Sequence, residues 1–256
     1  MTYLSGSTAM LCYPTSKFFG KRCFLIICAF LPLVINADTS ISITSGRGAP
    51  FVKPDQSGFY DLIVINMFKR AGLRAKTVLL PSERSLINAN TGIDDGNIAR
   101  IKGLEKKYPN LVMVPGKVID FDFVVFTKSK NFKVKDWRSL KPYNIAFING
   151  WKYFEKKARY YKSLTRVKSS TQLFNLLNNN RADIALYDLW SGLWWLRRNT
   201  ADIHFLLPPI ASVKLYLYVN KKYKKLVPML SRALAEMKKD GTYKLIYDKT
   251  LSRLLK

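Results

Sequence analysis

The sequence has little of the chemistry on which metal sites and many catalytic sites depend. Its 256 residues include one histidine, His204, and three cysteines, Cys12, Cys23 and Cys28. Zinc sites draw on clusters of cysteine and histidine, so we expect no metal site. A Ser-His-Asp triad would have to use His204, whose context, Ala-Asp-Ile-His-Phe-Leu-Leu, is typical of a strand with a structural histidine. We therefore expect no catalytic residue and no cofactor.

Acidic residues are scarce as well. The chain has 43 lysines and arginines against 17 aspartates and glutamates, which gives a net charge of +26. Such an excess can indicate nucleic-acid binding. Here the basic residues are spread along the chain, and the densest groups, 152–168 and 221–225, are interleaved with tyrosine and leucine as on solvated helix faces. We expect no nucleic-acid partner, but a cationic surface suited to anionic envelope lipids or acidic ligands.

A glycine-rich phosphate-binding loop is also missing. Residues 46–48 read Gly-Arg-Gly, which is too short for such a loop. No apolar run after residue 37 reaches the length of about 20 residues that spans a bilayer in a helix. These absences leave a globular domain without an evident nucleotide site or membrane span.

The first 37 residues have the pattern of a secretory signal peptide. Basic residues at 17–22 precede an uncharged run at 23–35, and Ala37 precedes a polar segment. The uncharged run is too short to cross a bilayer. A buried core helix and an uncleaved anchor are the alternatives. We predict cleavage near Ala37 and a periplasmic mature protein, which would be free of cysteine because all three cysteines lie in the removed segment.

After Ala37, strands and helices are predicted to alternate in two successive units. Strands are expected at 41–44, 76–80, 111–114, 121–126, 143–148, 183–187 and 213–219, and helices at 58–71, 83–89, 152–161, 170–179, 189–197 and 227–239. This alternation predicts an α/β layered unit in each half. Sheets of this class bind ligands at the carboxyl ends of their strands.

Several short motifs, taken in order, resemble the periplasmic solute-binding proteins of the polar amino-acid type, family 3. The motifs are a first helix at 58–72, Pro-Ser-Glu-Arg at 81–84 followed by Thr-Gly-Ile-Asp-Asp-Gly at 91–96, Asn-Gly at 149–150, the run 169–188, and Asp-Gly-Thr at 240–242. No motif is specific alone, but their order and spacing cover nearly the whole mature chain.

The resemblance implies a type II periplasmic binding fold with two lobes, each a mixed sheet flanked by helices. The lobes would comprise 38–126 with 216–256, and 128–214, joined by crossing strands at 123–127 and 213–218. The ligand would lie between them, and it favours a closed form only by touching both. A monomer, a small-molecule ligand and an inner-membrane ABC permease or receptor are also implied.

In the second lobe, the resemblance suggests Asp188 as the group that accepts a ligand's ammonium. Asp188 also stands before a predicted helix, where it could serve merely as an N-cap. Gly150 and Trp151 lie on a turn whose backbone N–H groups could reach an anion. Trp190 is a candidate for a ring facing the cleft, with a core position as the alternative.

In the first lobe, Arg84 and Arg100 are the candidates for a carboxylate clamp, because a guanidinium binds a carboxylate with two parallel hydrogen bonds. Either could instead be a surface arginine. Phe51 is expected to form an aromatic wall against the ligand or a part of the core. One departure matters: Arg100 follows Asp95 too closely, and the hydroxyl residue expected before the clamp arginine is absent. This weakens the case for a free α-amino acid and leaves an acidic, sugar-like or peptide-derived ligand open, and the basic charge leans toward an anionic one.

Three functions are therefore open. The first is binding of a small polar solute for transport or sensing. The solute would be an amino acid or another small compound, which could be anionic. The second is a periplasmic dehydratase-type enzyme on the same scaffold, which would need a general acid of tuned pKa such as Glu83. The third is a cationic envelope protein whose cleft has lost its ligand.

Overall fold

The computed structural model describes residues 40–255, apart from 150, 158–160 and 162. The predicted signal peptide lies outside these residues. Within them, no helix is both long enough and apolar enough to cross a membrane.

Among the described residues, nine strands form one hydrogen-bonded series in the order β2-β1-β3-β9-β5-β8-β6-β7, with β4 paired to β9. Their bounds are β1 Ile41–Ser45, β2 Ala75–Leu79, β3 Gly96–Arg100, β4 Leu111–Met113, β5 Ile119–Thr127, β6 Ile145–Ile148, β7 Leu164–Val167, β8 Ile184–Asp188 and β9 His204–Asn220. The pairs of β1 with β2 and β3, and of β6 with β7 and β8, are parallel. The pairs made by β5 and β9 are antiparallel, so the sheet is mixed.

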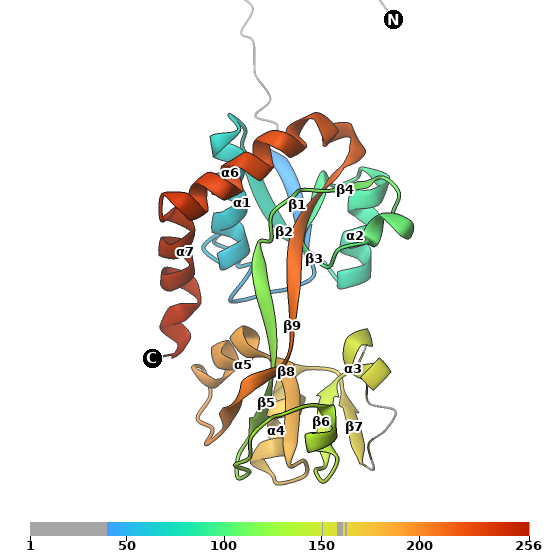
Figure 1. The fold of residues 1–256 in the computed structure, drawn as a ribbon, viewed down its shortest axis with the longest axis vertical. Coiled ribbons are helices and arrows are strands. Elements are labelled where there is room, and N and C mark those ends of the chain that lie inside the picture. Colours follow the sequence, from blue (N-terminus) through green and yellow to red (C-terminus); the bar gives the residue numbers. More distant parts are fainter. Residues whose placement is uncertain (1–39, 150, 158–160, 162, 256) are drawn as a thin grey trace, which may run out of the picture. The chain divides into compact units, whose positions relative to one another are not determined.

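Helices cover both parts of this sheet (Figure 1). They are α1 Phe59–Arg70, α2 Ser82–Thr91, α3 Lys152–Lys157, α4 Ser170–Asn178, α5 Leu189–Leu196, α6 Val227–Lys239 and α7 Thr242–Thr250. Short 3₁₀ turns occur at Leu104–Lys106, Trp137–Leu140, Lys221–Leu226 and Ser252–Leu255. Helices α1, α2, α6 and α7 accompany β1 to β4, whereas α3, α4 and α5 accompany β6 to β8.

Strands β5 and β9 connect the two groups of elements (Figure 1). The early part of β9 pairs with β5, with Phe205 opposite Phe126 and Leu215 opposite Ile119. The end of β9 pairs with β3 and β4, and the end of β5 pairs with β8. The predicted architecture of two α/β lobes joined by two crossing strands is therefore confirmed.

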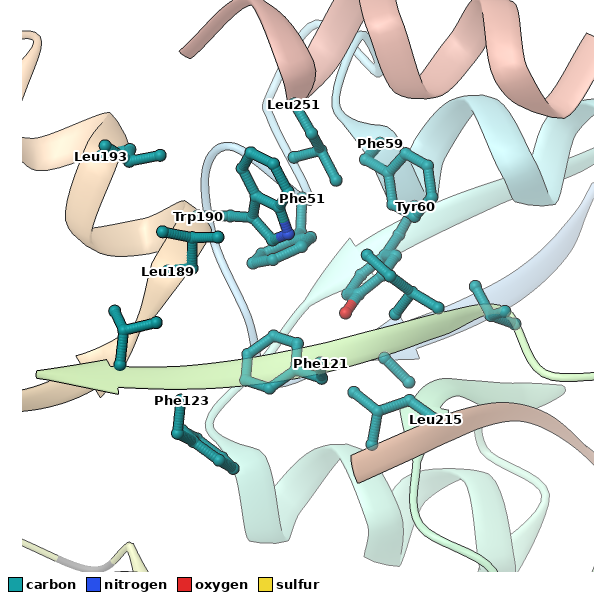
Figure 2. Packing of buried hydrophobic residues seen from close by; sticks show 14 of the residues in the cluster. Phe51, Phe59, Tyr60, Phe121, Phe123, Leu189, Trp190, Leu193, Leu215 and Leu251 are labelled. Atoms are coloured by element: carbon teal, nitrogen blue, oxygen red, sulfur yellow. The ribbon is translucent and has the colours of Figure 1, made fainter. Parts of the chain in front are cut away.

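Local sequence explains how α1 and its buried cluster are placed. Gly58 precedes α1, and its N–H donates to the Asp61 carboxylate at 2.8 Å. A Cβ at Gly58 would lie 2.3 Å from the Phe51 carbonyl oxygen, so no larger residue fits there. The Phe51 ring stacks on Tyr60 at 4.6 Å and lies 5.7 Å from Phe121 of β5, which joins α1 to a crossing strand (Figure 2).

A second close approach fixes the start of α5. A Cβ at Gly192 would lie 2.1 Å from the Phe126 ring, so glycine allows α5 to lie directly against β5. Asp188 ends β8 and is the N-cap of α5, accepting a hydrogen bond from the Ser191 N–H at 2.8 Å. The packing of α5 thus determines where the Asp188 carboxylate lies.

Candidate functional site

A cavity of about 530 Å³ lies where the two groups of elements meet the crossing strand β5. Its described lining residues are Ser45, Gly46, Arg47, Ser82, Ile98, Ala99, Arg100, Ile101, Phe123, Asn149 and Trp151. They come from the carboxyl ends of β1, β3 and β6, from the start of α2, and from β5 and the turn before α3. Carboxyl ends of strands are the usual ligand-binding edge of α/β sheets, and this volume suits a small metabolite.

The Arg100 guanidinium is tied to its own side of the cavity by four hydrogen bonds. Its Nε–H donates to Asn97 Oδ1 at 2.5 Å, and one terminal nitrogen donates to the Ser82 hydroxyl at 2.9 Å. The other donates to the Ser82 carbonyl at 3.0 Å and to the Ser85 hydroxyl at 2.6 Å. A guanidinium has five N–H groups, so one remains for a ligand.

A buried polar network supports these partners. The Asn97 amide donates to the Thr44 hydroxyl at 2.8 Å, and that hydroxyl donates to the Ser85 carbonyl at 2.9 Å. Asn97, Thr44 and Ser85 are all fully buried. Satisfied networks of this kind rigidify their surroundings, so Arg100 is held in a preformed position.

The backbone of β3 is irregular where it enters the cavity. The register with β9 shifts between Asn97 and Arg100, and Ala99 has a φ of 65°. A positive φ is costly for a residue other than glycine, and such residues concentrate at functional sites. This bulge turns the segment from Ile98 to Ile101 toward the cavity.

The Arg47 side chain extends from the loop after β1 toward β5, the turn before α3 and the end of β8. Its guanidinium lies 4.0 Å from the centre of the Phe121 ring and 5.3 Å from that of Trp151. One of its terminal nitrogens is 3.9 Å from Asp188 Oδ2. Arg47 therefore links the β1 loop to β5, to the turn before α3 and to the end of β8.

The Asp188 carboxylate is 1% exposed and uses its two oxygens differently. Oδ1 accepts the Ser191 cap hydrogen bond, whereas Oδ2 has no hydrogen-bond partner among the described residues and faces Arg47. Burial raises the pKa of the Asp188 carboxyl, and the positive charge of Arg47 opposes this rise. Asp188 is thus an N-cap and, at the same time, the counter-charge of Arg47.

Positive charge dominates the cavity wall. Arg47 and Arg100 both line it, and none of its described lining residues is acidic. Burial, and then the neighbouring charge of Arg47, lower the pKa of Arg100 to about 10. Arg100 remains protonated at neutral pH, so two like charges border the same space and an anion between them would relieve their repulsion.

Aromatic rings form another part of the wall. Trp151 meets Phe123 edge to face at 5.6 Å and stacks on Tyr187 at 5.1 Å. Trp151 also stacks on Phe154 of α3 at 5.5 Å. The cavity thus offers a flat apolar surface beside two guanidinium groups.

Comparisons with known proteins agree on the architecture. No protein-family model matches the chain. An uncharacterized protein of Shewanella oneidensis is 25% identical over 191 residues, which cover 72% of each chain. Among solved structures, a histidine kinase sensor domain with similarity to periplasmic binding proteins has a TM-score of 0.67 and 18% identity, over 83% of this chain and 96% of that one.

Two further solved structures are similar. An ancestral arginine-binding protein bound to arginine has a TM-score of 0.66 and 19% identity, over 82% of this chain and 97% of that one. The arginine-, lysine-, histidine-binding protein ArtJ of Geobacillus stearothermophilus has a TM-score of 0.64 and 16% identity, over 85% and 100%. The chain has the fold of the two-lobed periplasmic binding proteins. The resemblance noted in the sequence is confirmed at the level of this fold.

The periplasmic-binding-protein fold brings some of the sequence-predicted site residues together and separates others. Arg100 and Trp151 line the cavity. Asp188 is not in the lining but lies 3.9 Å from Arg47, which is. Phe51 and Trp190 are buried in the core and do not line it (Figure 2).

Of the two other predicted site residues, the structure describes one, and that one lies elsewhere. Arg84 is exposed on α2 and is not part of the lining. Gly150 lies outside the described residues. Asp94 and Asp95, expected to fix a turn, accept hydrogen bonds from the hydroxyl and the backbone N–H of Ser42, respectively.

Arg47 is the functional candidate that the sequence interpretation missed. It stands between two glycines directly after β1, and the glycines drew attention only as an incomplete phosphate loop. A lone arginine at the carboxyl end of the first strand, in a chain with this fold, is the signal that could have identified it.

Proposed function

We propose that the protein binds a small polar solute in this cavity and closes around it, for uptake or sensing. One observation supports this above all: the lining comes from β1 and β3 on one side and from the β6–α3 turn on the other. A solute stabilises a closed form only through contacts with both sides, and Arg100 and Asn149 offer polar groups from each.

The similar structures suggest the biological setting. Those with this fold include arginine-binding proteins and a kinase sensor domain, and proteins of amino acid ABC transporters. We propose, accordingly, a monomer exported to the periplasm by the segment 1–37, with an inner-membrane permease or receptor as partner. Its lobes would comprise 38–126 with 216–256, and 128–214.

The dehydratase alternative gains no support from Glu83. Its carboxylate is exposed and accepts hydrogen bonds from the Lys107 ammonium at 3.0 Å and the Tyr108 hydroxyl at 2.8 Å. These bonds lower the pKa of Glu83, which disfavours the protonated form that a general acid needs. Glu83 is also not part of the described cavity lining.

A thermal-shift screen of amino acids, organic acids and sugars tests the proposal. A ligand at one hundred times its Kd should stabilise the protein by about 2.7 kcal/mol. The same ligand should act far more weakly on Trp151→Leu, which removes a lining ring, than on Trp194→Leu, which removes a half-buried ring outside the lining. If no solute class shifts the melting temperature, the proposal is wrong.

A further inference from the structure

The surroundings of Arg47 indicate which solutes the cavity takes, given the proposed function on which this inference rests. A carboxylate is the strongest protein partner for a ligand amino group, and Asp188 is the candidate that the resemblance suggested. Asp188 Oδ1 is already occupied by the Ser191 N–H, and Oδ2 faces the Arg47 guanidinium at 3.9 Å. The protein's own cation therefore stands where a ligand's ammonium would have to approach.

A second buried oxygen also lacks a hydrogen-bond partner among the described residues. The Tyr60 hydroxyl is fully buried and, like Asp188 Oδ2, has no hydrogen-bond partner within the described part of the chain. Burial raises the pKa of the Tyr60 hydroxyl, and the positive charge of Arg47 opposes this rise. Unpaired buried acceptors are costly, and a guanidinium, with five N–H groups, can serve two of them at once.

The described part of the wall offers an amino group no carboxylate in place of Asp188. Arg47 and Arg100 border the cavity, and its described lining residues include no carboxylate. An ammonium placed there would meet two like charges, whereas a carboxylate would meet two opposite ones. Arg100 keeps one N–H for such a group, and Trp151 offers a ring beside it.

We propose that the cavity selects small carboxylic acids that lack an α-amino group, because Arg47 takes the place of that group in front of Asp188. Asp188 is then a positioning residue, which orients Arg47 and does not touch the ligand. Arg47 and Arg100 bind the ligand's carboxylate from the β1 and β3 sides of the cavity.

Matched ligand pairs test this selectivity on the purified wild-type protein. We would titrate succinate against aspartate, glutarate against glutamate, and 3-phenylpropionate against phenylalanine by calorimetry. In the pair that binds, the acid without an amino group should bind at least about tenfold more tightly than its amino acid, a difference of about 1.4 kcal/mol. Tighter binding of the amino acid overturns the inference while the proposed function stands.

Variants that remove a single charge test which residues bind the ligand's carboxylate. Arg47→Gln should weaken binding of the acid about tenfold or more, and Arg47→Lys should recover part of the loss. Arg84→Gln removes the same charge from the exposed face of α2 and should leave the affinity unchanged. Asp188→Asn keeps an oxygen for the Ser191 cap and should weaken acid binding less than Arg47→Gln does.

The opposite pattern contradicts the inference. If Asp188 accepts a ligand ammonium, Asp188→Asn abolishes amino-acid binding and Arg47→Gln leaves it intact or improves it. If neither series of compounds binds and no other solute does, the proposed function fails, and this inference fails with it.

Discussion

The two arginines of the cavity are held in contrasting ways. Arg100 donates four hydrogen bonds to Asn97, Ser82 and Ser85, all of which belong to the same side of the cavity as Arg100 itself. Arg47 is held by its contact with the Phe121 ring and by one long ion pair with Asp188, at the end of β8. One arginine is thus part of a rigid network, and the other reaches toward the opposite side.

Under the proposed function, this difference separates two tasks of a two-lobed binding protein. A preformed group lowers the entropic cost of binding, and Arg100 meets that requirement. A group that contacts the opposite lobe couples binding to closure, and Arg47 is placed to do so. Amino-acid substitutions in and around the cavity test this contrast.

Arg100→Ala should destabilise the fold by about 3 kcal/mol, because it leaves the buried Asn97 and Ser85 side chains without a charged partner. Arg84→Ala, on the exposed face of α2, should change the free energy of unfolding by less than about 0.5 kcal/mol. Urea unfolding of both variants measures the difference. Equal effects would show that the Arg100 network contributes nothing to stability.

Asp188→Ala should be less stable than Asp188→Asn by about 1 kcal/mol. Alanine removes the acceptor for the Ser191 N–H, whereas asparagine retains an oxygen that can cap α5. Comparison of the two in urea separates the capping role from the charge. Identical stabilities would contradict the capping role.

The pair of Arg47 and Asp188 should show a modest coupling of about 0.5–1 kcal/mol in a double-mutant cycle with Arg47→Gln and Asp188→Asn. The 3.9 Å separation without a hydrogen bond is the reason for this modest value. The cycle of Arg100→Ala with Ser85→Ala, whose side chains are 2.6 Å apart, should give a larger one. A reversed order would overturn the contrast between the two arginines.

The last prediction concerns pH dependence. Burial raises the pKa of Asp188 above its ordinary value of 3.8, so the folded state binds more protons than the unfolded state once the pH exceeds that value. The free energy of unfolding should therefore fall, relative to that of Asp188→Asn, as pH rises from 3.8 through the folded-state pKa. Urea unfolding of both proteins across this range tests the sign, and a relative gain in stability would contradict it.

Much of the fold follows from the sequence because it depends on local patterns. Apolar spacing predicts α1, observed at Phe59–Arg70. The length of β9 was not predicted. Its 17 residues include two adjacent prolines and several exposed positions, and they form one strand only because β5 and then β3 and β4 supply partners in turn.

The site was harder to predict because it depends on contacts between distant segments. The end of β8 identified Asp188 as either a ligand group or an N-cap, and the structure shows the cap. The other oxygen of Asp188 acquires its role from Arg47, which lies far away in the sequence and has no periodic pattern around it. For Phe51, the sequence allowed a wall or a core position equally well, and only its stacking on Tyr60 shows the core position.

A crystal structure of the protein with the acid that binds most tightly would show which groups hold the ligand carboxylate. We expect that carboxylate to lie within hydrogen-bonding distance, about 3 Å, of both the Arg47 and the Arg100 guanidinium groups. We also expect Arg47 to face Asp188 in the complex. A ligand bound outside the cavity, or an amino group on Asp188 with Arg47 displaced, would contradict it.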